Sequence, residues 1–156
     1  MAIEIERKFL VKGEEWRSLG TGTLYCQGYI PTKEGRTVRV RIAGDRAFLT
    51  IKGPSVGNAR TEFEYSIPVE DAREMLETLC DRPYIEKTRY KIVIGELTWE
   101  VDEFAGDNEG LILAEVELAE EHQVVELPDW IGEEVSGDAR YFNSNLAKNP
   151  FSRWSK

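Results

Sequence analysis

The 156-residue sequence has few of the residues that build redox, zinc or disulfide sites. Its two cysteines, Cys26 and Cys80, stand far apart and form no Cys-x-x-Cys motif. This spacing argues against a zinc site and against a disulfide framework, so both thiols are expected to be reduced and packed. The single histidine, His122, lies in a charged stretch and is expected at the surface rather than in a catalytic site.

The sequence also lacks any apolar run approaching the ~20 residues that a membrane-spanning helix needs. The N-terminal segment carries charge at alternate positions and has no apolar centre typical of a signal peptide, which predicts a cytoplasmic protein. A net charge of −9 disfavours nonspecific binding to nucleic acid or to an anionic membrane. With no linker or repeat, residues 1–156 are expected to form a single domain.

Alternation of apolar and polar residues dominates the chain and predicts β-strands. The expected strands cover residues 2–11, 24–31, 36–43, 46–53, 60–68, 84–94, 96–104 and 111–119. Short turn signals such as Gly44-Asp45 separate most of them, which favours antiparallel hairpins. Residues 69–80 instead show helical periodicity, a weaker helix is expected near residues 13–19, and the tail from about 129 to 148 is expected to pack against the body.

Charged side chains occupy one face of most predicted strands, because alternate residues of a strand point the same way. In the first strand Glu4, Glu6 and Lys8 share a face, and apolar residues occupy the other. The pattern recurs on seven of the eight predicted strands. It gives six cations, Lys8, Arg39, Arg41, Lys52, Lys87 and Arg89, and eight carboxylates, Glu4, Glu6, Glu62, Glu64, Glu100, Asp102, Glu115 and Glu117.

Two arrangements would place these charges on one face. An antiparallel sheet can expose such a face to water and lace it with salt bridges. Alternatively, the sheet closes with its charged face inward. Like charges pair within strands as Glu-x-Glu and Arg-x-Arg, where a solvated surface would mix signs, and this favours closure. The sequence therefore predicts a mainly β (α+β) fold, a closed eight-stranded antiparallel β-barrel with a few helices packed outside, of a size that holds one small ligand.

The chemistry of the charged face indicates the kind of ligand. Six cations can hold a long, multiply charged anion, and arginine forks suit phosphate oxygens. The carboxylates would repel such an anion directly, but they can hold hard divalent cations that bind it. A polyphosphate with metal ions satisfies both sets of charges, whereas a neutral sugar or a peptide does not.

A series of short segments resembles the CYTH superfamily, the triphosphate tunnel metalloenzymes. The first segment, EIERKF at residues 4–9, is similar to the ExExK signature of that superfamily. The resemblance continues in order over most of the chain, through QGYI (27–30), VRVRI (38–42), LTIKG (49–53), EFEY (62–65), EKTRY (86–90), WEVDEF (99–104), AEVEL (114–118) and EEVSGDARYFNSNLA (133–147).

This resemblance implies an eight-stranded tunnel that binds a triphosphate together with Mg²⁺ or Mn²⁺. The chain most resembles the short bacterial inorganic triphosphatases, which implies hydrolysis of tripolyphosphate to pyrophosphate and phosphate. Two kinds of alternative stay open. One is another activity of the superfamily, an adenylyl cyclase or a thiamine or nucleoside triphosphatase. The other is a non-catalytic polyphosphate-binding module. Whether the protein forms a homodimer is also open.

The working hypothesis is that water attacks a terminal phosphorus with help from the metal. The expected substrate-binding residues are Lys8, Arg39, Arg41, Lys52, Lys87 and Arg89. The expected metal-binding residues, whose alternative role is to hold the arginines in place, are Glu4, Glu6, Glu62, Glu64, Asp102, Glu115 and Glu117.

Tyr29 and Lys87 are the expected catalytic pair, which would orient or deprotonate the water. A purely hydrogen-bonding role for the phenol is the alternative. Arg7 has the wrong strand parity for the interior and is expected to pair at the surface. Arg140 and Tyr141 in the tail are expected to pack at the barrel wall.

Overall fold

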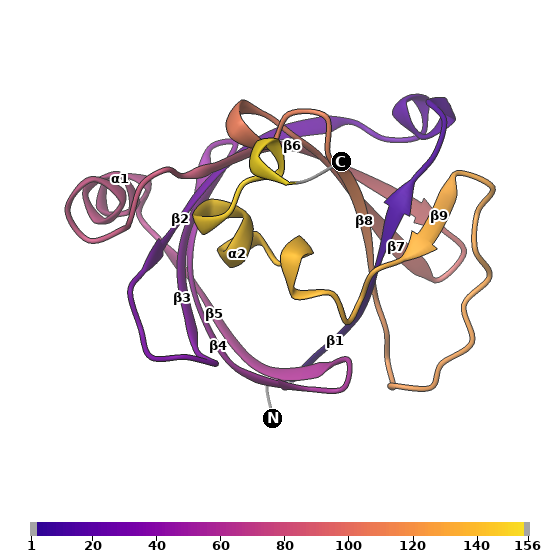
Figure 1. The fold of residues 1–156 in the computed structure, drawn as a ribbon, viewed down its shortest axis with the longest axis horizontal. Coiled ribbons are helices and arrows are strands. Elements are labelled where there is room, and N and C mark those ends of the chain that lie inside the picture. Colours follow the sequence, from indigo (N-terminus) through magenta and orange to yellow (C-terminus); the bar gives the residue numbers. More distant parts are fainter. Residues whose placement is uncertain (1–2, 155–156) are drawn as a thin grey trace.

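A computed structural model describes residues 3–154 of the chain. Figure 1 shows the strands forming a ring around a central space. The strands are β1 (Ile3–Val11), β2 (Gly22–Ile30), β3 (Thr37–Ala43), β4 (Arg46–Val56), β5 (Ala59–Ile67), β6 (Ile85–Ile94), β7 (Leu97–Phe104), β8 (Ile112–Glu117) and β9 (Ile131–Glu134). The helices are α1 (Val69–Thr78) and α2 (Asn143–Lys148), with short 3₁₀ turns η1 (Glu15–Ser18), η2 (Gly106–Asn108), η3 (Ala139–Tyr141) and η4 (Phe151–Arg153).

Eight of these strands close into an antiparallel barrel, as the sequence predicts. Their order is β5-β4-β3-β2-β6-β7-β8-β1, and pairing between β5 and β1 completes the ring. That closing pair is short, with Ile3 opposite Thr61 and Ile5 opposite Ala59. The ninth strand, β9, pairs with the later part of β1, where Phe9 lies opposite Glu134. The sequence did not predict β9, because a four-residue strand added to a distant edge leaves no periodic signal of its own.

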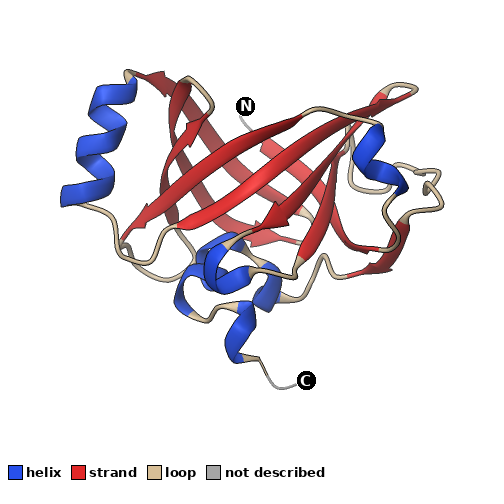
Figure 2. Cartoon of the chain, turned by 90° about the horizontal axis from the view of Figure 1, so that it is seen from above, coloured by secondary structure: helices blue, strands red, loops and turns tan. Residues whose placement is uncertain are grey.

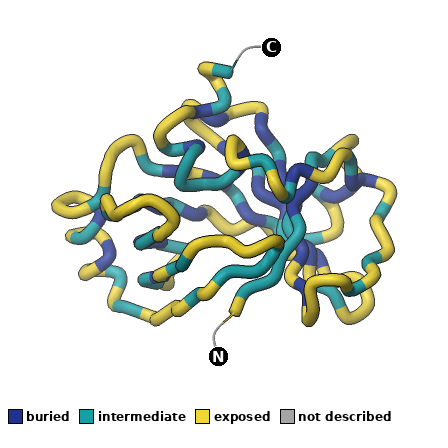
Figure 3. The backbone as a smooth tube through the Cα atoms, turned by 60° about the horizontal axis from the view of Figure 1, so that its bottom comes forward, coloured by how far each residue is buried: buried dark blue, intermediate teal, exposed yellow. Residues whose placement is uncertain are grey.

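Part of the barrel reverses the usual arrangement of apolar and charged side chains. Inward-facing Arg89 and Asp102 are only 6% and 0% exposed, whereas outward-facing Phe63 and Tyr65 are 44% and 57% exposed. In the first half of β6, buried positions alternate with exposed or partly buried ones, and Figure 3 shows the burial along the whole backbone. The expected closure around a charged interior, here called the lumen, is therefore confirmed.

Apolar packing supports the barrel from outside. Phe9, Trp99 and Val116 point outward from β1, β7 and β8 and pack with Trp16 of η1 and Trp130 of the loop before β9. A separate cluster joins α1 to the outer face of β3 and β4. Helix α1 covers the sheet as its amphipathic pattern predicts, because its buried residues lie on one face.

The C-terminal tail packs against the barrel, as expected, at two separate places. Trp130 and Ile131 pack on the outer wall, whereas α2 and the turn before it lie across one end of the ring, as Figures 1 and 2 show. Tyr141 and Leu146 there contact inward-facing Ile85, Phe104 and Leu113. This end of the lumen is therefore filled by an apolar plug, which strand periodicity could not reveal. In the described part of the chain, the helices are all too short or too polar to cross a membrane.

Candidate active site

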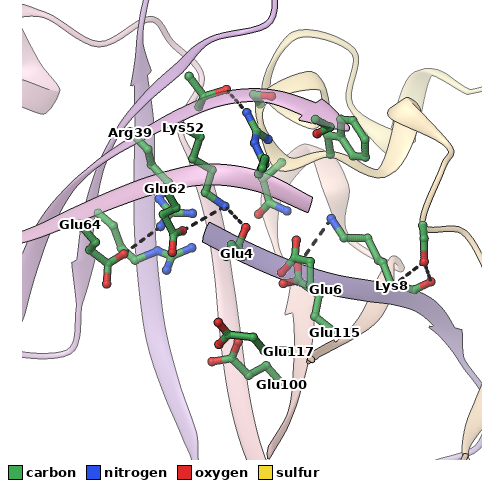
Figure 4. Close-up of a pocket in the computed structure, with 18 of the residues that line it drawn as sticks. Glu4, Glu6, Lys8, Arg39, Lys52, Glu62, Glu64, Glu100, Glu115 and Glu117 are labelled. Atoms are coloured by element: carbon green, nitrogen blue, oxygen red, sulfur yellow. Dashed lines mark hydrogen bonds and ion pairs between the residues drawn. The ribbon is translucent and has the colours of Figure 1, made fainter. Parts of the chain in front are cut away.

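The lumen contains a cavity of about 460 Å³ whose walls are strongly charged. The side chains in Figure 4 converge on it from several strands. The sequence predicts six substrate-binding cations and seven metal-binding carboxylates, thirteen charged residues in all. Twelve of them line the cavity, and so does Tyr29. The remaining one, Asp102, lies fully buried behind Lys87 and Arg89. The structure thus brings the whole expected set together.

Most lumen cations are paired with carboxylates. Lys52 Nζ lies 2.9 Å from Glu4 and 3.4 Å from Glu62. Arg39 lies 3.3 Å from Glu64, and Thr50 links the two by accepting a hydrogen bond from Arg39 and donating one to Glu64. The remaining pairs are Lys8 with Glu115, Lys87 with Asp102, and Arg89 with both Glu100 and Asp102.

Arg41 is different, because its guanidinium forms no ion pair within residues 3–154. Its Nε donates to Gln27 Oε1 at 2.8 Å. Burial lowers the pKa of Arg41, and the nearby charges of Arg39 and Arg89 lower it further. Such crowding of buried cations favours binding of an anion at this position.

Asp102 holds two of the buried cations in place. It accepts hydrogen bonds from Lys87 Nζ at 2.7 Å and from Arg89 Nε and Nη2 at 2.7 and 2.9 Å. Burial alone would raise the pKa of Asp102, but the charges of Arg89 and Lys87 outweigh it and lower that pKa. The single carboxylate of Asp102 is thus the counter-ion of two cations. Burial, together with repulsion by Arg89 and Arg41, holds the pKa of Lys87 well below its ordinary value.

The opposite imbalance occurs around Glu6. Glu6 on β1 lies directly opposite Glu117 on β8, and neither forms an ion pair with any cation in the described residues. Like charges facing each other across two strands are destabilising. Burial, with repulsion from Glu115 and Glu4, raises the pKa of Glu6 well above its ordinary value. Burial and the charges of Glu4 and Glu100 likewise raise the pKa of Glu117.

This part of the lumen fits a divalent cation. Glu4, Glu6, Glu100, Glu115 and Glu117 lie around the same space in Figure 4. Within residues 3–154, no three acidic, histidine or cysteine side chains form a preassembled ligand cluster. Mg²⁺ does not require one, because it is commonly held by one or two carboxylates together with water and substrate phosphates. Glu6 and Glu117, which form no ion pair within the described residues, are therefore suited to bind a metal ion that enters the lumen together with a phosphate anion.

The expected catalytic pair is joined through a hydrogen-bond network. Gln27 Nε2 donates to Tyr29 Oη at 3.0 Å and to Asn143 Oδ1 at 3.1 Å. Lys87 Nζ donates to the same Asn143 oxygen at 2.9 Å. Asn143 begins α2, so the plug at the end of the barrel contributes directly to the environment of Lys87. No local sequence pattern indicated a role for Asn143, because only the folded tail brings it to β2 and β6.

Three further lumen residues were missed although strand parity could have identified them. Arg60, Lys91 and Tyr25 share a face with expected lumen residues of their strands, and all three line the cavity. Arg89 and Arg41 lie over the Tyr25 ring at 5.1 and 4.9 Å, which gives the crowded cations a cation–π partner.

Other predicted positions lie outside the cavity. Arg7 pairs with Glu134 of β9 at 2.7 Å on the outer surface, as its parity predicts. Arg140 is exposed and pairs with Asp138, while Tyr141 is buried in the plug.

Comparisons with known proteins agree with this geometry. The sequence profile described as "CYTH domain" matches residues 2–148. The chain belongs to the CYTH domain family. Within this family it is 54% identical over 156 residues to an inorganic triphosphatase of Acetivibrio thermocellus, with full coverage of both chains. It is also 40% identical over 153 residues to an inorganic triphosphatase of Nitrosomonas europaea, covering 92% of this chain and 96% of that one.

A solved structure is similar as well. The crystal structure of the inorganic triphosphatase NE1496 superposes with a TM-score of 0.63 at 37% identity, covering 94% of this chain and 95% of that one. The family resemblance inferred from the ExExK segment and its successors is thereby confirmed.

Proposed function

We propose that this CYTH protein is a divalent-metal-dependent triphosphatase that hydrolyses inorganic tripolyphosphate to pyrophosphate and phosphate. The observation that carries the proposal is the split lumen, which has crowded cations around Arg41 and Arg89 and uncompensated carboxylates at Glu6 and Glu117. A metal–polyphosphate complex supplies the missing charge at both places. The activities named for the two curated relatives support the same choice.

The cavity is large enough to hold an inorganic triphosphate. Its volume is about 460 Å³. The ten oxygens of tripolyphosphate, counted at the volume of one liquid water each, fill roughly 300 Å³. The remaining space suits water and metal ions.

The lumen residues divide into three groups by role. We assign Lys8, Arg39, Arg41, Lys52 and Arg89 to the phosphate oxygens, where they stabilise charge that develops during the reaction. We assign the metal to Glu4, Glu6, Glu62, Glu64, Glu115 and Glu117. For Asp102 we favour positioning of Lys87 and Arg89, because its oxygens already accept three hydrogen bonds. Bound Mg²⁺ or Mn²⁺ would neutralise phosphate charge and acidify water.

Lys87 is placed to receive a proton. Its Nζ donates hydrogen bonds to Asp102 and Asn143, which leaves its third position toward the cavity. The lowered pKa of Lys87 favours a lone pair at that position. Tyr29 accepts from Gln27, so its own hydrogen is free to orient a water or a phosphate oxygen. Water adds to the terminal phosphorus, the bond to the bridging oxygen breaks, and pyrophosphate leaves with that electron pair.

A substrate panel tests the proposal. The protein is incubated with tripolyphosphate, ATP or thiamine triphosphate and each divalent metal, and phosphate, pyrophosphate and cyclic AMP are measured. Rapid phosphate release from tripolyphosphate is expected. Cyclic AMP without phosphate would identify a cyclase instead, and tight binding without turnover would identify a polyphosphate-binding module.

A further inference from the structure

Arg60 is a lumen cation outside the set assigned above to the phosphate oxygens. It lies on β5, lines the cavity and faces Glu4 across the seam that closes the barrel. Despite this position, Arg60 forms no ion pair within the described residues. Arg41 also lacks an ion pair there, whereas Arg39 and Arg89 each have at least one. An anionic ligand gains more binding free energy from a cation without an ion-pair partner than from one already paired with a carboxylate.

The guanidinium of Arg60 is fixed in orientation while part of it is left free. Its Nε donates to the backbone oxygen of Gly53 at 2.9 Å, and its Nη2 donates to Thr37 Oγ1 at 3.4 Å. Nη1 has no hydrogen-bond partner within residues 3–154. Partial burial lowers the pKa of Arg60, and the nearby carboxylates of Glu4 and Glu6 act against this. The side chain is thus held in place with one nitrogen available to a ligand.

The strand register sets Arg60 apart from the catalytic lysine. Arg41, Arg39 and Thr37 follow one another at alternate positions on the inner face of β3. From Arg41 to Thr37 the strand advances ~13 Å, at about 3.3 Å per residue. Arg41 binds Gln27, which belongs to the network of Lys87, whereas Arg60 binds Thr37. Arg60 and Lys87 therefore lie near different ends of an elongated ligand in the lumen.

We propose that Arg60 binds the end of the triphosphate that departs as pyrophosphate, away from the phosphoryl group attacked near Lys87. The inference rests on the proposed hydrolysis, because it assigns the two ends of that substrate. Lys52 lies in the same part of the lumen, but its charge is already shared with Glu4 and Glu62. Arg60 supplies the uncompensated charge at this end.

The test compares three variants with the wild type. Arg60→Gln removes the charge, Arg60→Lys keeps it, and Arg73→Gln removes one positive charge from the exposed surface of α1 as the matched control. Loss of a hydrogen bond to a charged group predicts that Arg60→Gln raises KM for tripolyphosphate about tenfold, with kcat changed less than twofold. Pyrophosphate should inhibit Arg60→Gln about tenfold more weakly, while inhibition by orthophosphate stays unchanged. Arg60→Lys should recover most of the affinity, and Arg73→Gln should match the wild type.

Several results would overturn the assignment. One is a raised KM with unchanged inhibition by pyrophosphate, and another is an equal weakening by both product anions. A third is an Arg60→Lys variant as defective as Arg60→Gln with a similarly lowered melting temperature, which would show that Arg60 only supports the backbone at Gly53. If the wild type releases no phosphate, the hydrolytic proposal fails separately. Calorimetric titration of tripolyphosphate into wild type and Arg60→Gln then decides the role of Arg60, because an unchanged Kd contradicts it.

Discussion

Replacing Asp102 with asparagine tests how the barrel tolerates a charged interior. Asp102 is fully buried, and its carboxylate is the bridge between Lys87 and Arg89. The asparagine side chain has nearly the same shape and can still accept one hydrogen bond. The substitution therefore removes the negative charge while leaving little cavity behind.

The expected loss of stability is large because two buried cations remain. Breaking a buried ion pair by removing one partner costs about 3–5 kcal/mol. For a chain of this size, that corresponds to a fall in melting temperature on the order of 10 °C. The matched control is Glu103→Gln, which removes the partner of Arg17 at the surface, where the two side chains are 37% and 35% exposed. A surface pair contributes at most about 1 kcal/mol.

Thermal unfolding of the metal-free protein, with and without tripolyphosphate, measures both effects. The added anion should raise the melting temperature of Asp102→Asn more than that of the wild type, because phosphate replaces the lost charge. The pKa of Asp102 is lowered on folding, so the stability it confers is present above its ordinary pKa and is lost as the pH falls through the folded value. The wild type and Glu103→Gln should both show this contribution, and Asp102→Asn should lack it. A change no larger than that of Glu103→Gln would refute the reasoning.

Two further substitutions test the roles assigned to Glu6 and Lys87. Glu6→Gln should abolish metal-dependent phosphate release while the circular dichroism spectrum stays unchanged, and normal turnover would remove Glu6 from the metal site. Because folding raises the pKa of Glu6, the stability of the metal-free wild type should fall as the pH rises through that folded value, a fall that Glu6→Gln should lack. Lys87→Met should lower kcat by about 10²-fold or more, as expected for a general base. It should also flatten the acid limb of the kcat–pH profile, and an unaltered limb would assign the proton to another group.

Strand periodicity was sufficient to predict the barrel and most of its lumen. In β1 and β8 the alternation of glutamates with Ile5 and Val116 shows which residues share a face, because a strand has only two faces. The same rule also places Arg60, Lys91 and Tyr25 on the inner face. Arg7 was correctly excluded from the lumen by that rule.

Features that depend on contacts distant in sequence were not predictable in this way. β5 pairs with only the first residues of β1, so the rest of that β1 edge is available to β9. The sequence of residues 131–134 contains no pattern that identifies β1 as the pairing strand. The apolar residues of the tail predicted that it packs against the body, but not that Tyr141 and Leu146 fit the apolar end of the lumen. Asn143 reaches Lys87 only as a consequence of this docking.

Phosphorus-31 magnetic resonance of the reaction itself examines the central claim most directly. Tripolyphosphate is followed with Mg²⁺ or Mn²⁺ in the presence of wild-type protein, with Glu6→Gln as the matched control. The split lumen predicts that the triphosphate signals give way to equal amounts of pyrophosphate and orthophosphate with the wild type alone. Triphosphate signals that broaden on binding but persist undiminished would show that the charged cavity holds the anion without cleaving it.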